Sequence, residues 1–170
     1  MIRLALALAL SGLATLASAQ TPGYQRLEVA ARHRGGVIPG ALWYPAAGSG
    51  ERVTIGENIL FYGVQALSNP SLAAGVHPLV LVSHGSGGNM TGLSWLAAGL
   101  ARQGALVLMV NHPGSTSGES TPAGSVPLDL RARDLSAALD QVLGEPALAG
   151  AIDPARIAVL GFSMGGGTAE

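Results

Sequence analysis

A serine flanked by glycines is the feature of this sequence that most directly suggests chemistry. Residues 161–165 read GFSMG, a G-x-S-x-G segment that follows an apolar run and opens a glycine-rich stretch. A serine hydroxyl is a weak nucleophile unless it is exposed, has a base to take its proton and faces donors for the oxyanion. A sharp strand-to-helix turn provides the exposure, and its crowding requires Gly161 and Gly165 on either side. We therefore predict that Ser163 is a nucleophile at the tip of such a turn.

Two backbone N–H groups are expected to hold the oxyanion. The first is the N–H of Met164, directly after the nucleophile, at the start of a helix whose free N–H groups favour negative charge. The second should come from a loop after an earlier strand, and HGSGG at 84–88 follows the apolar run 78–83. A glycine-rich turn there exposes N–H groups at the same edge of the sheet. We assign the second donor to the N–H of Ser86, with Gly85 as the alternative.

The glycines of the HGSGG segment also allow a nucleotide-binding interpretation, which the sequence argues against. Gly85 and Gly87 could begin a G-x-G-x-x-G motif, but its third glycine would fall at Met90. The next strand should then end in an acidic residue that binds a ribose, and it ends in Asn111. A G-x-x-x-x-G-K-[ST] phosphate loop is excluded as well, because the chain contains no lysine.

The chain has 4 histidines, and none of them is assigned as the catalytic base. We interpret His84 as a residue that braces the HGSGG loop. His112 is interpreted as structural or as part of a pocket wall. His33 and His77 have no neighbour in the sequence that indicates a role.

The acidic residues of the second half are interpreted as structural. Asp134 and Asp140 lie on an amphipathic helical pattern, and we assign both to its solvated face. Asp153 and Pro154 have the residue types of a helix N-cap and a first helical position, which predicts a single helical turn there. No group of histidine, aspartate or glutamate residues has the spacing of a metal site, so no metal is expected.

The elements that must position the nucleophile alternate along the chain. Strand character is found in the segments 25–32, 37–44, 78–83, 105–110 and 156–160. Leucine spacing predicts one helix over 93–100, ended by Gly104, and a second over 128–142, ended by Gly144. The order strand, helix, strand, helix, strand is typical of an α/β fold with a mostly parallel sheet and flanking helices. That fold places Ser163 directly after its third buried strand.

Three connecting stretches complete this outline. Residues 34–36 are predicted to form the turn of a hairpin between the first two strands. Residues 46–76 are rich in glycine, serine and asparagine, and we interpret them as a long surface excursion. Residues 111–127 form a polar loop, and loops of that length in a compact domain are usually functional or mobile.

Residues 1–19 have the organisation of a signal peptide. Arg3 forms a short basic region, an apolar stretch follows, and small residues precede a cleavage site near Ala19. Interruptions at Ser11 and Gly12 leave the stretch shorter than the roughly 20 residues that span a bilayer, so no stable membrane anchor is expected. The chain contains no cysteine, which excludes a cysteine-linked lipid and disulfides. We expect an exported protein, in a bacterial periplasm or outside the cell.

Composition limits the other partners. The chain has 170 residues, of which 48% are hydrophobic and 11% charged, and this suits one folded domain. Its formal net charge is −1, which gives no electrostatic reason to expect nucleic acid or an anionic membrane as a partner.

Taken together, these segments resemble the α/β-hydrolase superfamily, and within it the dienelactone-hydrolase-like branch that includes the platelet-activating-factor acetylhydrolases. The matching segments are LWYPA (42–46), PLVLVSHGSGG (78–88), VNHPG (110–114) and IDPARIAVLGFSMGGGTA (152–169). The resemblance implies hydrolysis of carboxylic esters through an acyl-serine intermediate, on a small-molecule or lipid-like substrate and without a cofactor. A close alternative is the bacterial cutinase and polyester-hydrolase group, which shares the S-M-G-G-G elbow but has an aromatic residue in the oxyanion loop.

The resemblance also implies an acid and a histidine that follow the nucleophile along the chain. Asp153 and His84 precede Ser163 and so break that order. We therefore expect the acid and the general base beyond residue 170. Residues 20–170 would then be the N-terminal part of a single α/β-hydrolase domain, inactive by itself, with 157–160 as an exposed apolar edge. Two other hypotheses stay open, namely a non-catalytic exported binding module and acyl transfer to an alcohol instead of water.

Overall fold

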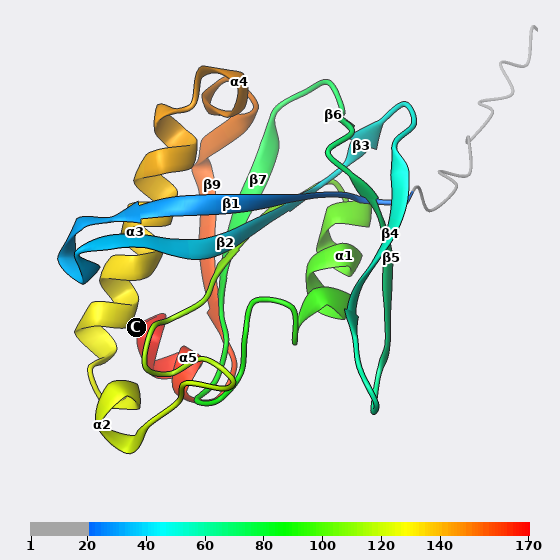
Figure 1. Cartoon of the computed structure of the whole chain (residues 1–170). Coiled ribbons are helices and arrows are strands. Elements are labelled where there is room, and N and C mark those ends of the chain that lie inside the picture. Colours follow the sequence, from blue (N-terminus) through cyan, green and yellow to red (C-terminus); the bar gives the residue numbers. More distant parts are fainter. Residues whose placement is uncertain (1–20) are drawn as a thin grey trace, which may run out of the picture.

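A seven-stranded sheet is the centre of the computed structural model, which describes residues 21–170; the signal peptide expected at 1–19 lies outside the described residues. The strands of the sheet are β1 (Gly23–Ala31), β2 (Gly36–Tyr44), β4 (Glu51–Glu57), β5 (Tyr62–Ser68), β7 (His77–Ser83), β8 (Leu106–Val110) and β9 (Ile152–Gly161). Their order in the sheet is β4-β5-β1-β2-β8-β7-β9. Figure 1 shows how these strands are arranged in space. Two short strands, β3 (Ala46–Ala47) and β6 (Ser71–Leu72), pair separately.

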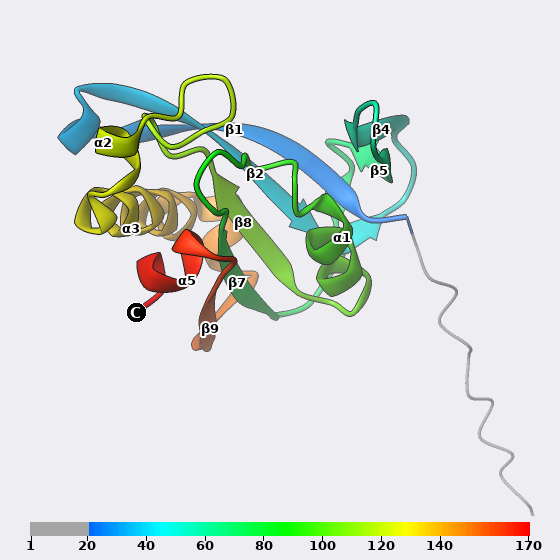
Figure 2. The ribbon, with the colours of Figure 1, turned by 90° about the horizontal axis from the view of Figure 1, so that it is seen from below.

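Helices cover both faces of this sheet. They are the 3-10 turn η1 (Arg32–Arg34), α1 (Ser94–Arg102), α2 (Pro122–Ser125), α3 (Leu128–Gly144), α4 (Pro146–Ala149) and α5 (Met164–Thr168). Figure 2 shows α1 and α3 on opposite faces of the sheet. Within residues 21–170, every helix is too short or too polar to span a bilayer.

The hairpin predicted for the first two strands is confirmed. β1 and β2 pair in antiparallel register from Gly23 opposite Tyr44 to Ala31 opposite Gly36. The chain reverses through η1, and Gly35 follows with a φ of 77°, a left-handed conformation that glycine adopts without steric cost.

The interpretation of residues 46–76 as a surface excursion is wrong. β4 and β5 form an antiparallel hairpin there, and β5 pairs in parallel with β1, so the stretch adds two strands to the sheet. Val53, Ile55 and Val64 lie partly buried against the core. Glycine and polar residues between them obscured the two-residue period of these strands in the sequence.

The α/β architecture is confirmed by the strands around β8. β7 pairs in parallel with β8 and with β9, whereas β2 joins the other side of β8 in antiparallel register. Successive side chains of a strand point to opposite faces. Leu106, Leu108 and Val110 therefore pack in the core beneath α3, and Val107 and Met109 pack in the core beneath α1.

Helix α1 occupies the predicted place but buries different residues. Its buried positions are Ser94, Ala97, Ala98 and Ala101, while the predicted leucine stripe lies at the margin of the core. Small side chains on the buried face allow the helix to approach the sheet closely.

The last strand, β9, begins earlier than predicted and is more exposed. Asp153 and Pro154 lie within it, at an irregularity of its pairing with β7, so the helical turn predicted for them is wrong. The Asp153 carboxylate accepts hydrogen bonds from the backbone of Ala155 and the side chain of Arg156, which stabilises this irregularity. Among residues 21–170, β9 pairs with β7 alone, and Leu160 is 38% exposed, as expected for an apolar edge but not for a buried strand.

Candidate active site

Ser163 occupies a sharp turn between β9 and α5, as predicted. Its φ of 54° and ψ of −122° are unusual for a residue with a side chain, and its side chain is exposed. A Cβ atom on Gly161 would overlap the carbonyl oxygen of Gly165, and one on Gly165 would overlap the carbonyl oxygen of Ser83. The bend therefore requires glycine at both positions, and it presents the Ser163 hydroxyl to solvent.

The HGSGG loop lies directly against this turn. A Cβ atom on Gly85 would lie 3.2 Å from the Cβ of Ser163 and 3.2 Å from the carbonyl oxygen of Phe162. Ser86 and Met164, the two predicted oxyanion donors, line one open hollow of about 400 Å³. In the part of the chain that the structure describes, neither of their backbone N–H groups donates a hydrogen bond. The structure thus brings Ser163, Ser86 and Met164 together, and their catalytic roles remain predictions.

The far wall of this hollow comes from the loop at 111–127. Helix α2 contributes Pro122 and Ser125, and Val126 follows it. The Ser125 hydroxyl lies 2.9 Å from the Ser86 hydroxyl, so the loop is tied to the HGSGG segment by its side chains. Figure 1 shows α2, α5 and this loop gathered at one end of the sheet.

Asp134 is fully buried, which corrects the interpretation that it lies on a solvated helix face. One carboxylate oxygen accepts hydrogen bonds from His33 Nε2 at 2.7 Å and Arg34 Nε at 2.9 Å. The other accepts from Arg34 Nη2 at 2.8 Å and His112 Nδ1 at 2.9 Å. Burial by itself raises the pKa of Asp134, but these hydrogen bonds outweigh it and lower the pKa to about 2. Asp140, on the same helix, is exposed as predicted.

Ser83, His112 and Asp134 form a second serine cluster that sequence reasoning missed. The Ser83 hydroxyl lies 3.0 Å from His112 Nε2, and His112 Nδ1 lies 2.9 Å from the Asp134 carboxylate. Burial lowers the pKa of His112, which favours the neutral ring, and the contacts fit a hydrogen on Nδ1 facing Asp134 with Nε2 accepting from Ser83. The contacts match those of a Ser–His–Asp triad, but all three side chains are fully buried and no substrate can reach Ser83.

His84 braces its loop, as predicted. It is buried, its Nδ1 donates to the carbonyl oxygen of Gly85 at 2.7 Å, and its Nε2 accepts the backbone N–H of His112 at 3.3 Å. Burial is the main reason why its pKa falls to about 4. Both ring nitrogens are occupied by backbone groups, so His84 is unsuited to act as a base for Ser163.

The two remaining histidines have partners that the sequence did not reveal. His33 belongs to the cluster around Asp134. His77 has its ring nitrogens 2.9 Å from the carbonyl oxygen of Gly104 and 3.1 Å from that of Ala73, and it joins two turns. Among residues 21–170, no three histidine, aspartate or glutamate side chains are placed to hold a metal ion.

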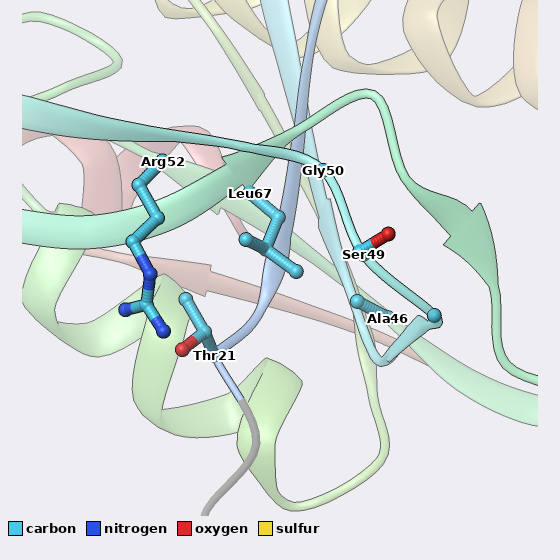
Figure 3. Close-up of a pocket in the computed structure, with 7 residues that line it drawn as sticks. Thr21, Ala46, Ser49, Gly50, Arg52 and Leu67 are labelled. Atoms are coloured by element: carbon cyan, nitrogen blue, oxygen red, sulfur yellow. The ribbon is translucent and has the colours of Figure 1, made fainter.

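Several further hollows lie away from Ser163, and two of them show what they contain. One, of about 320 Å³, is where β1 begins and is lined by Thr21, Ser49 and Arg52 among others (Figure 3). The second, of about 280 Å³, lies between the β4–β5 hairpin and α1 and includes Phe61 and Trp95. Neither these two nor the hollows of about 590 and 240 Å³ beside α3 contain a residue of the elbow or of the HGSGG segment, so the hollow beside Ser163 is the candidate active site.

Comparison with known protein families agrees with this geometry. Residues 46–170 match the model of a family described as PET hydrolase-like. The chain belongs to the PET hydrolase-like family. The α/β-hydrolase superfamily expected from the sequence is thereby confirmed. Within it, the matched family corresponds to the polyester-hydrolase alternative and not to the dienelactone-hydrolase-like branch.

Proteins whose names state an activity are similar to this PET hydrolase-like chain. A bis(hydroxyethyl) terephthalate hydrolase of Streptomyces coelicolor is 33% identical over 97 residues, which cover 57% of this chain and 28% of that protein. Cutinase est2 of Thermobifida alba is 34% identical over 90 residues, which cover 52% of this chain and 27% of that protein. A ferulic acid esterase structure from Streptomyces cinnamoneus superposes with a TM-score of 0.70 at 27% identity.

The chain spans only part of each of these relatives. The structural match covers 88% of this chain but 54% of the ferulic acid esterase, and the two sequence matches cover less than a third of each relative. Residues 46–170, which the family model matches, include the elbow and the HGSGG loop.

Proposed function

We propose that the whole protein is a serine hydrolase of carboxylic esters that works through an acyl-serine intermediate. The observation that carries this proposal is the exposed, strained Ser163, which lies against the HGSGG loop and beside the hollow lined by Ser86 and Met164. The relatives whose names state an activity, a terephthalate ester hydrolase, a cutinase and a ferulic acid esterase, support it.

The residues have distinct roles in the proposed reaction. The Ser163 oxygen attacks the ester carbonyl carbon while a general base takes the hydroxyl proton. The N–H groups of Ser86 and Met164 donate to the oxyanion that forms. The tetrahedral intermediate collapses, and the alcohol leaves with that proton. Water then attacks the acyl-serine by the same route, which releases the acid and restores Ser163.

The general base and its acid are proposed to lie beyond residue 170. His84 and His112 are held by buried partners, so within residues 21–170 neither can serve Ser163. A hydrolase of this superfamily supplies its acid and histidine after the nucleophile, in that order. We propose the same order here.

The substrate is proposed to be an apolar ester, either a small molecule or a lipid-like or polyester chain. Pro122, Val126 and Met164 give the hollow beside Ser163 an apolar lining, and Phe162 is 62% exposed next to the nucleophile. Ester substrates with apolar acyl groups fit such a lining. Export to the periplasm or the medium, through residues 1–19, is part of the proposal.

Labelling with a fluorophosphonate tests the nucleophile, with the buried serine as a matched control. In the whole protein, Ser163→Ala should abolish labelling and reduce ester turnover by roughly six orders of magnitude, because the covalent step is lost. Ser83→Ala should leave labelling in place, since its hydroxyl has no access to solvent. Persistent labelling of the Ser163→Ala variant would overturn the assignment, and a whole protein that is never labelled would favour the binding-module hypothesis.

A further inference from the structure

Arg131 is a fully buried cation that joins the segments around the candidate active site. Its guanidinium group donates to Thr168 Oγ1 at 2.9 Å, to Ser115 Oγ at 2.6 Å and to Ser83 Oγ at 3.2 Å. A further short hydrogen bond runs to the carbonyl oxygen of His84. One side chain of α3 thus holds β7, the HGSGG loop, the loop at 111–127 and α5.

Two of these contacts lead directly to the predicted oxyanion donors. The Thr168 hydroxyl, which accepts from Arg131, donates in turn to the carbonyl oxygen of Met164 at 3.2 Å. Arg131 also donates to the backbone carbonyl oxygen of His84, which precedes Ser86 by two residues. Arg131 is therefore the group that connects the turn carrying one donor to the loop carrying the other.

A third contact stabilises the same loop from behind. Ser115 accepts from Arg131 through its hydroxyl, and its backbone carbonyl accepts the N–H of Gly87 at 2.9 Å. The segment with Ser86 is consequently held at both ends, by the His84 carbonyl before it and by Gly87 after it.

Stability alone does not explain a guanidinium group at this place. Burial is the main reason that the pKa of Arg131 is lowered, which reflects the cost of placing its charge there. Within residues 21–170, its hydrogen-bond acceptors are hydroxyls and a carbonyl, and no carboxylate contacts it directly. Well-packed apolar residues often stabilise a core as much as a buried ion does. What an apolar residue cannot reproduce is a set of directed hydrogen bonds to four segments.

We propose that Arg131 is a positioning residue that sets the distance between the Ser86 and Met164 N–H groups and so preorganises the oxyanion hole. This inference rests on the proposed esterase function. An oxyanion hole stabilises the transition state more strongly than it stabilises the bound substrate. Loss of the Arg131 contacts should therefore lower kcat and leave KM nearly unchanged.

The sharpest test uses Thr168, because its substitutions are small. In the whole protein, Thr168→Val removes the hydroxyl that links Arg131 to Met164 and should lower kcat about tenfold, whereas Thr168→Ser keeps the hydroxyl and should restore it. Arg131→Met should lower kcat roughly 100-fold or more, with KM within about threefold of the original value. Arg133→Met, an exposed arginine two residues along the same helix, is the matched control and should change neither constant.

Fluorophosphonate titration separates positioning from simple loss of fold. A positioning role predicts one labelled Ser163 per molecule in Thr168→Val, reached at a slower rate. A decrease in labelled fraction that accounts for the whole loss of kcat would overturn the proposal. So would a normal kcat in both Thr168→Val and Arg131→Met, while labelling of the unmodified protein would still uphold the esterase function. An unmodified protein that is not labelled at all would overturn both proposals.

Discussion

Two serines stand near the carboxyl ends of adjacent parallel strands, and they differ in what each one lacks. Ser83 is the last residue of β7. Its hydroxyl contacts His112, which in turn contacts Asp134, but Ser83 is fully buried. Ser163 follows β9 and has an exposed hydroxyl on a strained backbone. A bonded His–Asp pair is therefore not enough to make Ser83 the candidate nucleophile. Solvent access and backbone geometry select Ser163 instead.

The pairing register explains why neighbouring strands give such different outcomes. Ser83 lies opposite Gly161 in the sheet, so its side chain stays within the layer covered by α3. Ser163 comes two residues after Gly161, where the chain has already left the sheet and turned. The buried cluster around Ser83 then supports the surface on which Ser163 stands, since the carbonyl of Ser83 accepts the N–H of Phe162 at 3.1 Å.

The largest effect is expected from Gly161→Ala, which should disrupt the turn that exposes Ser163. The new methyl group would overlap the Gly165 carbonyl, and backbone cannot yield as a flexible side chain would. We expect a loss of more than about 5 kcal/mol in the free energy of unfolding, measured by urea denaturation, or no folded protein. Gly99→Ala is the control, because the position is helical and open, and it should stabilise by up to about 1 kcal/mol. Equal stability of the two variants would contradict the elbow geometry.

Asp134→Asn tests whether the buried cluster is structural or catalytic. The substitution removes the negative charge that Arg34 and His112 face, so we expect unfolding to be easier by about 4 kcal/mol at pH 7. The molecules that remain folded should label at Ser163 at the normal rate. Asp140→Asn, exposed on the same helix, should change stability by less than about 0.5 kcal/mol. A stable Asp134→Asn variant with a large loss of labelling rate would make the buried cluster part of the catalytic machinery.

Acidification should destabilise the fold in two separate pH windows, one from His84 and one from Asp134. Unfolded histidine has a pKa of 6.5, and burial lowers that of His84 to about 4, so between these values the unfolded chain binds a proton that the folded chain does not. The contribution of His84 to the free energy of unfolding should therefore fall by about 3 kcal/mol as the pH drops from 6.5 to 4. Asp134, with its folded pKa of about 2 below the ordinary 3.8, stabilises fully above pH 3.8 and loses this contribution only below it.

Urea denaturation at a series of pH values measures both windows. His84→Gln, which cannot take up a proton, should make the fall between pH 6.5 and 4 smaller by about 3 kcal/mol and leave the lower window unchanged, while the buried His112 still contributes to the upper window. The same slope in both proteins would show that His84 is not buried in its neutral form.

Local patterns were sufficient for much of the fold. The apolar runs at β7 and β8 and the turn at Gly35 follow from the residues themselves, and so does the elbow, where no other residue fits at Gly161. The helical spacing of α3 also indicated that Asp134 is buried, a signal that the prediction of a solvated Asp134 did not use. Arg131 and Asp134 fall on the same stripe as Leu135, Ala138 and Val142, which indicates that both charged residues face the core.

The sequence by itself determined the α/β pattern, the glycine-bounded elbow and the superfamily, because each depends on neighbouring residues or on short periods. Only the tertiary structure decided that β4 and β5 extend the sheet, that β9 contains an irregularity instead of a helical turn, and that Asp134 is buried. The partners of Asp134 lie 22 to 101 positions away along the chain. A buried charge is stabilised by groups that folding brings together, and no local pattern states which groups those are.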